Sequence, residues 1–418
     1  MTNPRTNYAL AGAALFNPMA VMYWLDVMRG QRPGTGLLLV STAGAVCAGL
    51  AAEPRRHPWR ALASGLVAAA GAALASWVLR RYVDWVSEAA VVDKPALNAH
   101  DLLWPAAAVG AGTVGLSALV GREPEHYVEY SGKHGDYRWI SATPHPAQRW
   151  LAWSGYLLHQ FAIWGCIYAA QHQRLPYTTA LKRLNWIALA ANAGGVALHY
   201  LQSHYTYDGL ARDVPEGSAL GSVAFILMLT LALEAPRRGL FFGSRRVLPP
   251  PELVRFARRF HGYIFSWAST YNFWYHPIDP KPLHYTGLFH TLLLFVQSAL
   301  IYTKAHRDPR WTLVLELMVL PHAVVSTLYK RSGLGAMFTF SLLAMFVINQ
   351  MHGLGLSQRA RWTIGVAYAT TALTYYGVRR EWHRLPDILR IPILEYGVLG
   401  ILVLLSLLMR AVRQSKER

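Results

Sequence analysis

Residues 391–409 read IPILEYGVLGILVLLSLLM, an apolar run in which Glu395 carries the only charge. An α-helix rises about 1.5 Å per residue, so a run of this length crosses the hydrocarbon core of a bilayer, which is about 30 Å thick. Only helices and closed barrels cross lipid with their backbone hydrogen bonds satisfied, and the alternating strands of a barrel are absent from this sequence. The run therefore predicts a transmembrane helix and an all-α fold.

Apolar runs of similar length recur along the chain, separated by short charged islands. The composition agrees with this pattern, because 53% of the residues are hydrophobic and only 15% are charged. We therefore expect a polytopic transmembrane helical bundle of about ten to twelve spans. The runs lie near residues 8–28, 35–52, 61–79, 102–121, 149–170, 184–205, 218–235, 286–303, 311–328, 334–352, 362–377 and 391–409.

One break divides the chain. Residues 236–262, PRRGLFFGSRRVLPPPELVRFARRFHG, combine seven arginines with a triproline that no helix passes through. After the prolines, apolar residues recur at helical spacing opposite arginines, which is typical of a helix lying in the membrane interface; a plain basic linker is the alternative. We expect an N-terminal transmembrane half at 1–235, this linker with its interfacial helix at 236–262, and a C-terminal transmembrane half at 263–418. The arginines place the linker in the cytoplasm.

The basic residues give a formal net charge of +18, a value that nucleic-acid-binding proteins also reach. Here the arginines stand in pairs at the ends of apolar runs, as at Arg237-Arg238 and Arg379-Arg380, where they meet lipid headgroups. We therefore expect membrane lipid and an apolar small molecule as partners, and no nucleic acid.

The N-terminus and the two cysteines lead to two further expectations. The first residues lack the charged and apolar regions of a cleaved signal peptide, so we expect the first helix to be retained. Both cysteines, Cys47 and Cys166, lie in apolar runs, which gives no sign of a disulfide framework or a CxxC zinc site. We expect an integral, multi-pass protein of a bacterial inner membrane.

Polar side chains inside a span are costly, so they are functional candidates unless they bond a neighbouring helix. In ALHYLQSHYTYDGLARD, His204 and Asp208 stand four residues apart and share a helix face. A histidine beside a carboxylate suits a divalent iron or zinc ion. His284, His290 and His322 complete the predicted metal ligands. A polar helix end at which Asp208 begins a loop is the alternative.

A second set of residues predicts acid–base chemistry. Glu316, Asn349 and His352 lie in or at the end of strongly apolar runs and are the predicted catalytic residues. A histidine followed by glycine late in the chain resembles the catalytic histidine of the membrane-bound O-acyltransferases, which would make His352 a general base positioned by Asn349 or Asn272. The match is confined to these residues, since Met351 stands where that family has tryptophan.

Together these patterns lead to three functional hypotheses. The first is an integral membrane enzyme acting on a lipid or isoprenoid-like substrate with iron or zinc as cofactor. The second is a metal-independent acyl or group transferase using His352. The third is a proton-coupled secondary transporter using Glu316, Asp208 and Glu234. The histidine boxes of membrane desaturases are absent, and a heme site would need His276, which lies among prolines.

Overall fold

The computed structural model describes residues 81–82, 84–87, 98–120, 127–129, 139–141, 145–246, 248–278, 281–329 and 333–416. Over these ranges the chain is predominantly helical, with one short antiparallel hairpin in which β1 (Tyr127–Glu129) pairs with β2 (Trp139–Ser141). The expected spans at 8–28, 35–52 and 61–79, the N-terminus and Cys47 lie outside the described residues.

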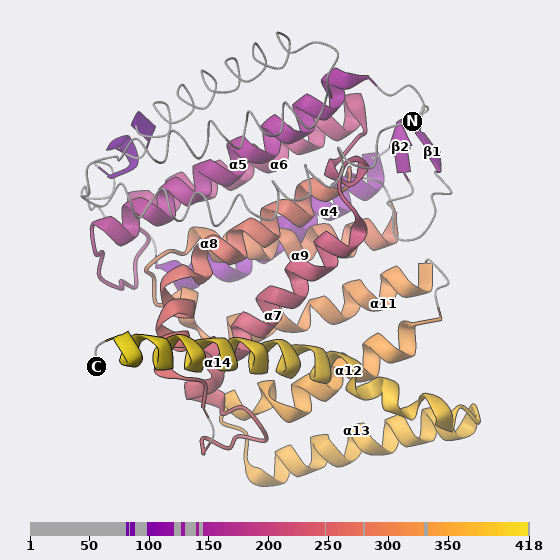
Figure 1. Cartoon of the computed structure of the whole chain (residues 1–418). Helices are drawn as coiled ribbons and strands as arrows, with labels where there is room; N and C mark the ends of the chain where they lie inside the picture. Colours follow the sequence, from indigo (N-terminus) through magenta and orange to yellow (C-terminus); the bar gives the residue numbers. More distant parts are fainter. Residues whose placement is uncertain are drawn as a thin grey trace, which may run out of the picture.

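The α-helices follow one another with short connections, and Figure 1 shows them in layers, with α5 and α6 side by side in one layer and α13 in another. Their bounds are α4 (Ala99–Val120), α5 (Pro146–His172), α6 (Arg183–Thr206), α7 (Glu216–Arg238), α8 (Pro251–Tyr275), α9 (Pro282–Ala299), α10 (Pro309–Leu317), α11 (Val319–Tyr329), α12 (Gly335–Ile348), α13 (Gln358–Val378) and α14 (Arg390–Lys416). Short 3₁₀ turns lie at 210–212, 305–307, 350–353 and 382–389.

Local sequence explains where several helices begin and end. Pro146, Pro251, Pro282 and Pro309 each stand at the start of a helix, where the missing N–H of proline costs nothing. Asp308 caps α10, because its carboxylate accepts the backbone N–H groups of Arg310 and Trp311, at 2.8 and 3.1 Å. Prolines therefore set the breaks that separate α7, α8 and α9.

Four helical stretches are long and apolar enough to cross a membrane: Glu216–Arg238, Pro309–Tyr329, Gly335–Gly353 and Trp382–Val412. They coincide with the runs expected at 218–235, 311–328, 334–352 and 391–409, so an integral membrane protein is supported for this part of the chain. The other runs after residue 98 also lie largely in helices. Their insertion, and the total of about ten to twelve spans, stay predictions.

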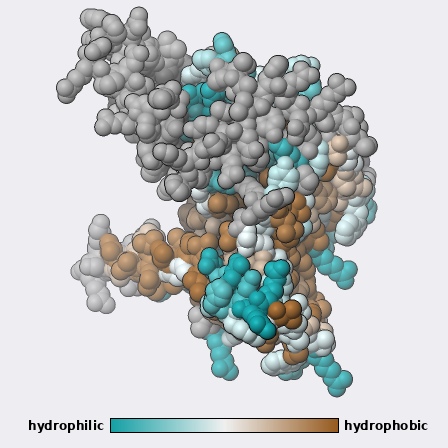
Figure 2. Space-filling model, turned by 90° about the vertical axis from the view of Figure 1, so that its right-hand side faces the viewer, coloured by the Kyte–Doolittle hydropathy of each residue, from teal (hydrophilic) through white to brown (hydrophobic). Residues whose placement is uncertain are grey.

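Six helices close a ring. Helix α8 packs against α7 and α9, α9 against α11, α11 against α12, α12 against α14, and α14 returns to α7. Outside this ring, α5 packs on α8 through a core of large aromatic side chains, among them Tyr156, Trp164, Tyr271 and Trp274. On the face in Figure 2, hydrophobic side chains cover much of the described surface around a hydrophilic group.

The predicted interfacial helix does not form a separate element. Residues 251–262 are the first turns of α8, which continues without a break to Tyr275. Leu253 and Ala257 are buried against α7 and α14, whereas Phe256 is 46% exposed, so only part of this apolar face packs on protein. Hydrophobic spacing alone does not distinguish protein from lipid as the partner, since burial against either favours the same apolar face.

Candidate functional site

A cavity of about 130 Å³ lies between α7, α8, α9 and α11. Three of the five predicted metal ligands, His284, His290 and His322, line it together with His276. The rest of the wall is mainly apolar, with Val223, Ile226, Leu227, Ala268, Phe273, Ile278, Leu288, Leu294 and Val319. The tertiary fold thus brings together histidines that the sequence places up to 46 residues apart.

His290 is fixed by a bond to the neighbouring helix. Its Nε2 lies 2.9 Å from the backbone oxygen of Leu315 in α10. A carbonyl can only accept, so Nε2 carries the hydrogen and Nδ1 of the neutral ring is left as a hydrogen-bond acceptor. The contact therefore sets both the orientation and the tautomer of the ring.

His322 contacts a hydroxyl group of α9. Oγ1 of Thr286 lies 3.2 Å from Nδ1 of His322 and 3.1 Å from Leu283 O. The Thr286 contact therefore sets the orientation of the His322 ring.

The other two histidines lie at the break between α8 and α9. The rings of His276 and His284 stack with centroids 4.5 Å apart. Helix α6 holds this break in place, since His199 Nε2 donates to His276 O at 3.0 Å and Ser203 Oγ accepts the backbone N–H of Ile278 at 3.0 Å. The polar segment at the end of α6 therefore supports the cavity from outside rather than lining it.

Two side chains of α8 add polar groups to the wall. Asn272 Nδ2 donates to Ser222 Oγ and to Ala268 O, both at 2.7 Å, and Ser269 Oγ donates to Phe265 O at 2.6 Å. The sequence predicted Asn272 only as a partner for His352. Ser269 was not predicted, because a serine within an aromatic helix gives no sequence signal of function.

The predicted pair of His204 and Asp208 does not form. Helix α6 ends at Thr206, and Tyr207 has a φ of 65°, so the chain leaves the helix before Asp208. His204 is exposed, whereas Asp208 is buried and forms an ion pair with Arg212 Nη1 at 2.5 Å. The prediction failed because it continued the helix two residues too far. The alternative, in which Asp208 begins a loop, matches the structure.

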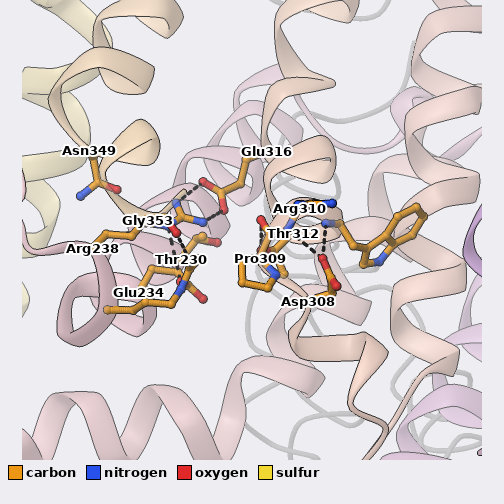
Figure 3. A network of polar contacts seen from close by, with 12 residues as sticks. Thr230, Glu234, Arg238, Asp308, Pro309, Arg310, Thr312, Glu316, Asn349 and Gly353 are labelled. Atoms are coloured by element: carbon orange, nitrogen blue, oxygen red, sulfur yellow. Dashed lines mark hydrogen bonds and ion pairs between the residues drawn. The ribbon is translucent and has the colours of Figure 1, made fainter. Parts of the chain in front are cut away.

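Two of the three predicted catalytic residues, Glu316 and Asn349, lie at a second polar group, shown in Figure 3. Glu316 points toward Arg238 and receives both of its terminal nitrogens, at 2.5 and 2.6 Å. Arg238 Nε also lies 3.4 Å from Glu234, which in turn bonds Arg237. This group joins the end of α7 to α10 as a buried ion pair.

Asn349 and His352 serve the same region as structural residues. Asn349 Nδ2 donates to the backbone oxygens of Gly239 and Leu240, at 2.9 and 3.2 Å, which fixes the turn after α7. His352 Nε2 donates to Val347 O at 3.1 Å. Both side chains therefore have structural partners, and Asn349 does not bond the His352 ring as the transferase hypothesis expects.

Nor does Asn272 approach His352. Asn272 bonds Ser222 near the start of α7, whereas Gly353, next to His352, accepts Arg237 Nη1 at the other end of that helix. Fifteen residues of helix separate these contacts along α7, a distance of about 22 Å. The structure therefore gives no support to a His352 and Asn272 pair.

The metal prediction is also left without support. Among the described residues, no group of three or more His, Cys, Asp or Glu side chains lies close enough to hold a metal ion. The cavity histidines that could have formed one bond to backbone and threonine partners or stack on each other.

A tight contact between α9 and α11 offers a test of the cavity wall. A Cβ atom at Gly287 would lie 2.8 Å from Cε1 of His322, closer than side chains tolerate. We expect Gly287→Ala to push His322 from its place and destabilise the protein by about 1–3 kcal/mol, as overpacking does. Thermal unfolding in detergent measures this. Gly221→Ala, where a Cβ meets open space in the same bundle, is the control and should change little.

The comparison with known proteins identifies no family for this chain. No protein-family model, curated protein or solved structure matches the chain.

Proposed function

We propose that the protein is a membrane-embedded enzyme that carries out acid–base chemistry on a lipid or isoprenoid-like substrate, with His290 and His322 as the reacting bases. One observation carries the proposal: an apolar cavity between α7, α8, α9 and α11 is lined by several histidines, one of which, His290, is held in a defined tautomer. Concave apolar sites with a few convergent polar groups are where small-molecule ligands bind.

The depth of the cavity supports an apolar substrate. Val223 and Leu227 lie near the middle of the candidate span Glu216–Arg238, and Val319 and His322 lie near the middle of Pro309–Tyr329. Ionisable side chains at this depth are costly and mark functional sites. A substrate dissolved in the bilayer reaches such a site directly.

The size of the cavity limits what enters it. A protein cavity of about 150 Å³ holds a benzene-sized group, and this one measures about 130 Å³. It therefore takes the reacting end of a lipid or isoprenoid, while the rest of the chain remains outside.

The chemistry follows from the ring nitrogens. A neutral histidine with one nitrogen held by the protein uses the other to remove a proton from a bound group and later returns it, which contributes about 10²–10⁴-fold to a rate. The side chains can do this on their own, and the proposal requires no metal.

Binding can be tested in nanodiscs with a photoreactive diazirine analogue of geraniol. We expect saturable labelling of α7, α8 and α9 residues that line the cavity, located by mass spectrometry. Leu227→Trp, which fills the cavity, should abolish this labelling. Leu220→Trp, on the same helix at a side chain that is 60% exposed, should leave it unchanged. Labelling that is not saturable, or that survives Leu227→Trp in a folded protein, would refute the proposed site.

We also propose that the basic end of the bundle faces the cytoplasm of a bacterial inner membrane. Three candidate spans, Glu216–Arg238, Gly335–Gly353 and Trp382–Val412, end on this side of the bundle. Arg237 bonds Gly353, which joins the ends of the first two, and Arg410 of the third lies near Glu252 at the start of α8. Arg245, Arg246, Arg255, Arg258 and Arg259 are exposed at this end. Cytoplasmic arginines near spans fix orientation.

Replacing those five arginines by glutamine should therefore invert or scramble the topology. Reporter fusions after residue 246 and after residue 380 measure it. The control replaces Arg379, Arg380 and Arg390 at the opposite end, which should leave the topology intact. An unchanged map for the fivefold variant would remove this orientation.

A further inference from the structure

Several polar side chains in the cavity wall already donate their N–H or O–H hydrogens to other protein groups. His290 donates its Nε2 hydrogen to Leu315 O, which leaves Nδ1 as an acceptor. Both amide hydrogens of Asn272 are donated, to Ser222 Oγ and Ala268 O, so this side chain can offer a ligand only its carbonyl oxygen. These two polar groups can accept a hydrogen bond but cannot give one.

Ser269 follows the same pattern. Its hydroxyl hydrogen is donated to Phe265 O at 2.6 Å, so its oxygen faces a ligand as an acceptor. The hydroxyls of Tyr285 and Thr291, also in the wall, can act either way. Acceptors therefore outnumber fixed donors in the part of the wall whose hydrogen bonds are defined.

The wall is also free of formal charge. None of the described residues that line the cavity is a lysine, arginine, aspartate or glutamate. A phosphate or carboxylate placed here would lose its hydration without gaining a cation, and an ammonium group would lack an anion. A charged ligand is thus disfavoured, and so is a neutral ligand that can only accept hydrogen bonds.

We infer that the cavity binds the hydroxyl end of a neutral, apolar alcohol or phenol, whose O–H donates to the acceptors of His290, Asn272 and Ser269. This inference rests on the proposed function and names the substrate class of the same site. The hydroxyl that binds in this way is also the group from which a histidine can remove a proton.

Competition for the diazirine probe tests the inference. Geraniol, geranyl methyl ether and geranyl phosphate share one chain and differ only in the head group. We expect geraniol to displace the probe at about a tenfold lower concentration than the ether, which lacks the donor. Geranyl phosphate should compete less well than either, because its charge is not paired in the cavity.

Two variants connect this preference to the wall. His290→Phe and Ser269→Ala each remove an acceptor. Each should bring the ratio of the displacing concentrations of ether and alcohol close to one, with the affinity for the ether nearly unchanged. Ser266→Ala is the matched control, since Ser266 lies one turn away on α8 and accepts Trp164 Nε1 at 3.1 Å outside the cavity. It should keep the full ratio.

The outcomes separate the two claims. Equal competition by alcohol and ether, or stronger competition by the phosphate, would overturn the inference while the labelled cavity still supported the proposed function. Absence of saturable labelling in the wild-type protein would overturn both. A ratio that falls equally in Ser266→Ala would show that the preference does not come from these acceptors, and would also overturn the inference.

Discussion

Replacing Arg238 by methionine will destabilise the protein by about 3–5 kcal/mol, because it leaves Glu316 buried opposite no positive charge. The two side chains are 2% and 10% exposed and meet through two parallel hydrogen bonds of 2.5 and 2.6 Å. Arg238 also neutralises Glu234 at 3.4 Å. Loss of the arginine therefore affects two carboxylates at once.

Thermal unfolding of the purified protein in detergent measures the loss, and a second substitution tests its cause. Arg238→Met with Glu316→Leu removes both charges and should recover most of the stability, as it does when buried ion pairs are replaced by apolar side chains. Arg255→Met is the control, because the pair that Arg255 forms with Glu252 is exposed and worth at most about 1 kcal/mol. If Arg238→Met unfolded at the same temperature as Arg255→Met, the ion pair would not hold α7 to α10.

The sequence predicted the parts of the fold that depend on local pattern. Length and hydropathy located the four candidate spans, since each is a property of a continuous run. The triproline located the break between α7 and α8 for the same reason, whereas α9 begins at Pro282, four residues before the run expected at 286–303. In contrast, Leu253 and Ala257 showed only an apolar face, and whether lipid or α7 covers that face depends on the tertiary fold.

The candidate site was predicted in part. His284, His290 and His322 were named because histidine is costly inside a span, and they do line one cavity. Their convergence depends on how α9 and α11 pack, which spacing along the chain does not encode. Glu316 was predicted to be a catalytic residue, and Arg238 was interpreted as a headgroup anchor. Only the structure shows that this arginine turns inward to the carboxylate.

The largest expected effect on catalysis is at His290 and His322, the two proposed bases. Glutamine places its amide nitrogen where Nε2 of histidine lies, so His290→Gln can keep the bond to Leu315 O and lose the basic nitrogen. Asparagine matches Nδ1, so His322→Asn can keep the contact with Thr286. Both variants should therefore fold normally and lower turnover by about 10²–10⁴-fold, the usual contribution of a general base.

Turnover can be measured before the natural substrate is known. Wild-type and variant proteins in nanodiscs are incubated with an isoprenoid alcohol and membrane lipid extract, and the lipid-soluble products are compared by mass spectrometry. His204→Gln is the control, because His204 is exposed on α6 away from the cavity, and it should retain the wild-type rate. Thermal unfolding of all the proteins separates loss of chemistry from loss of fold. Wild-type rates in folded His290→Gln and His322→Asn would show that neither histidine is the base. The cavity would then be a binding site without acid–base chemistry at these residues.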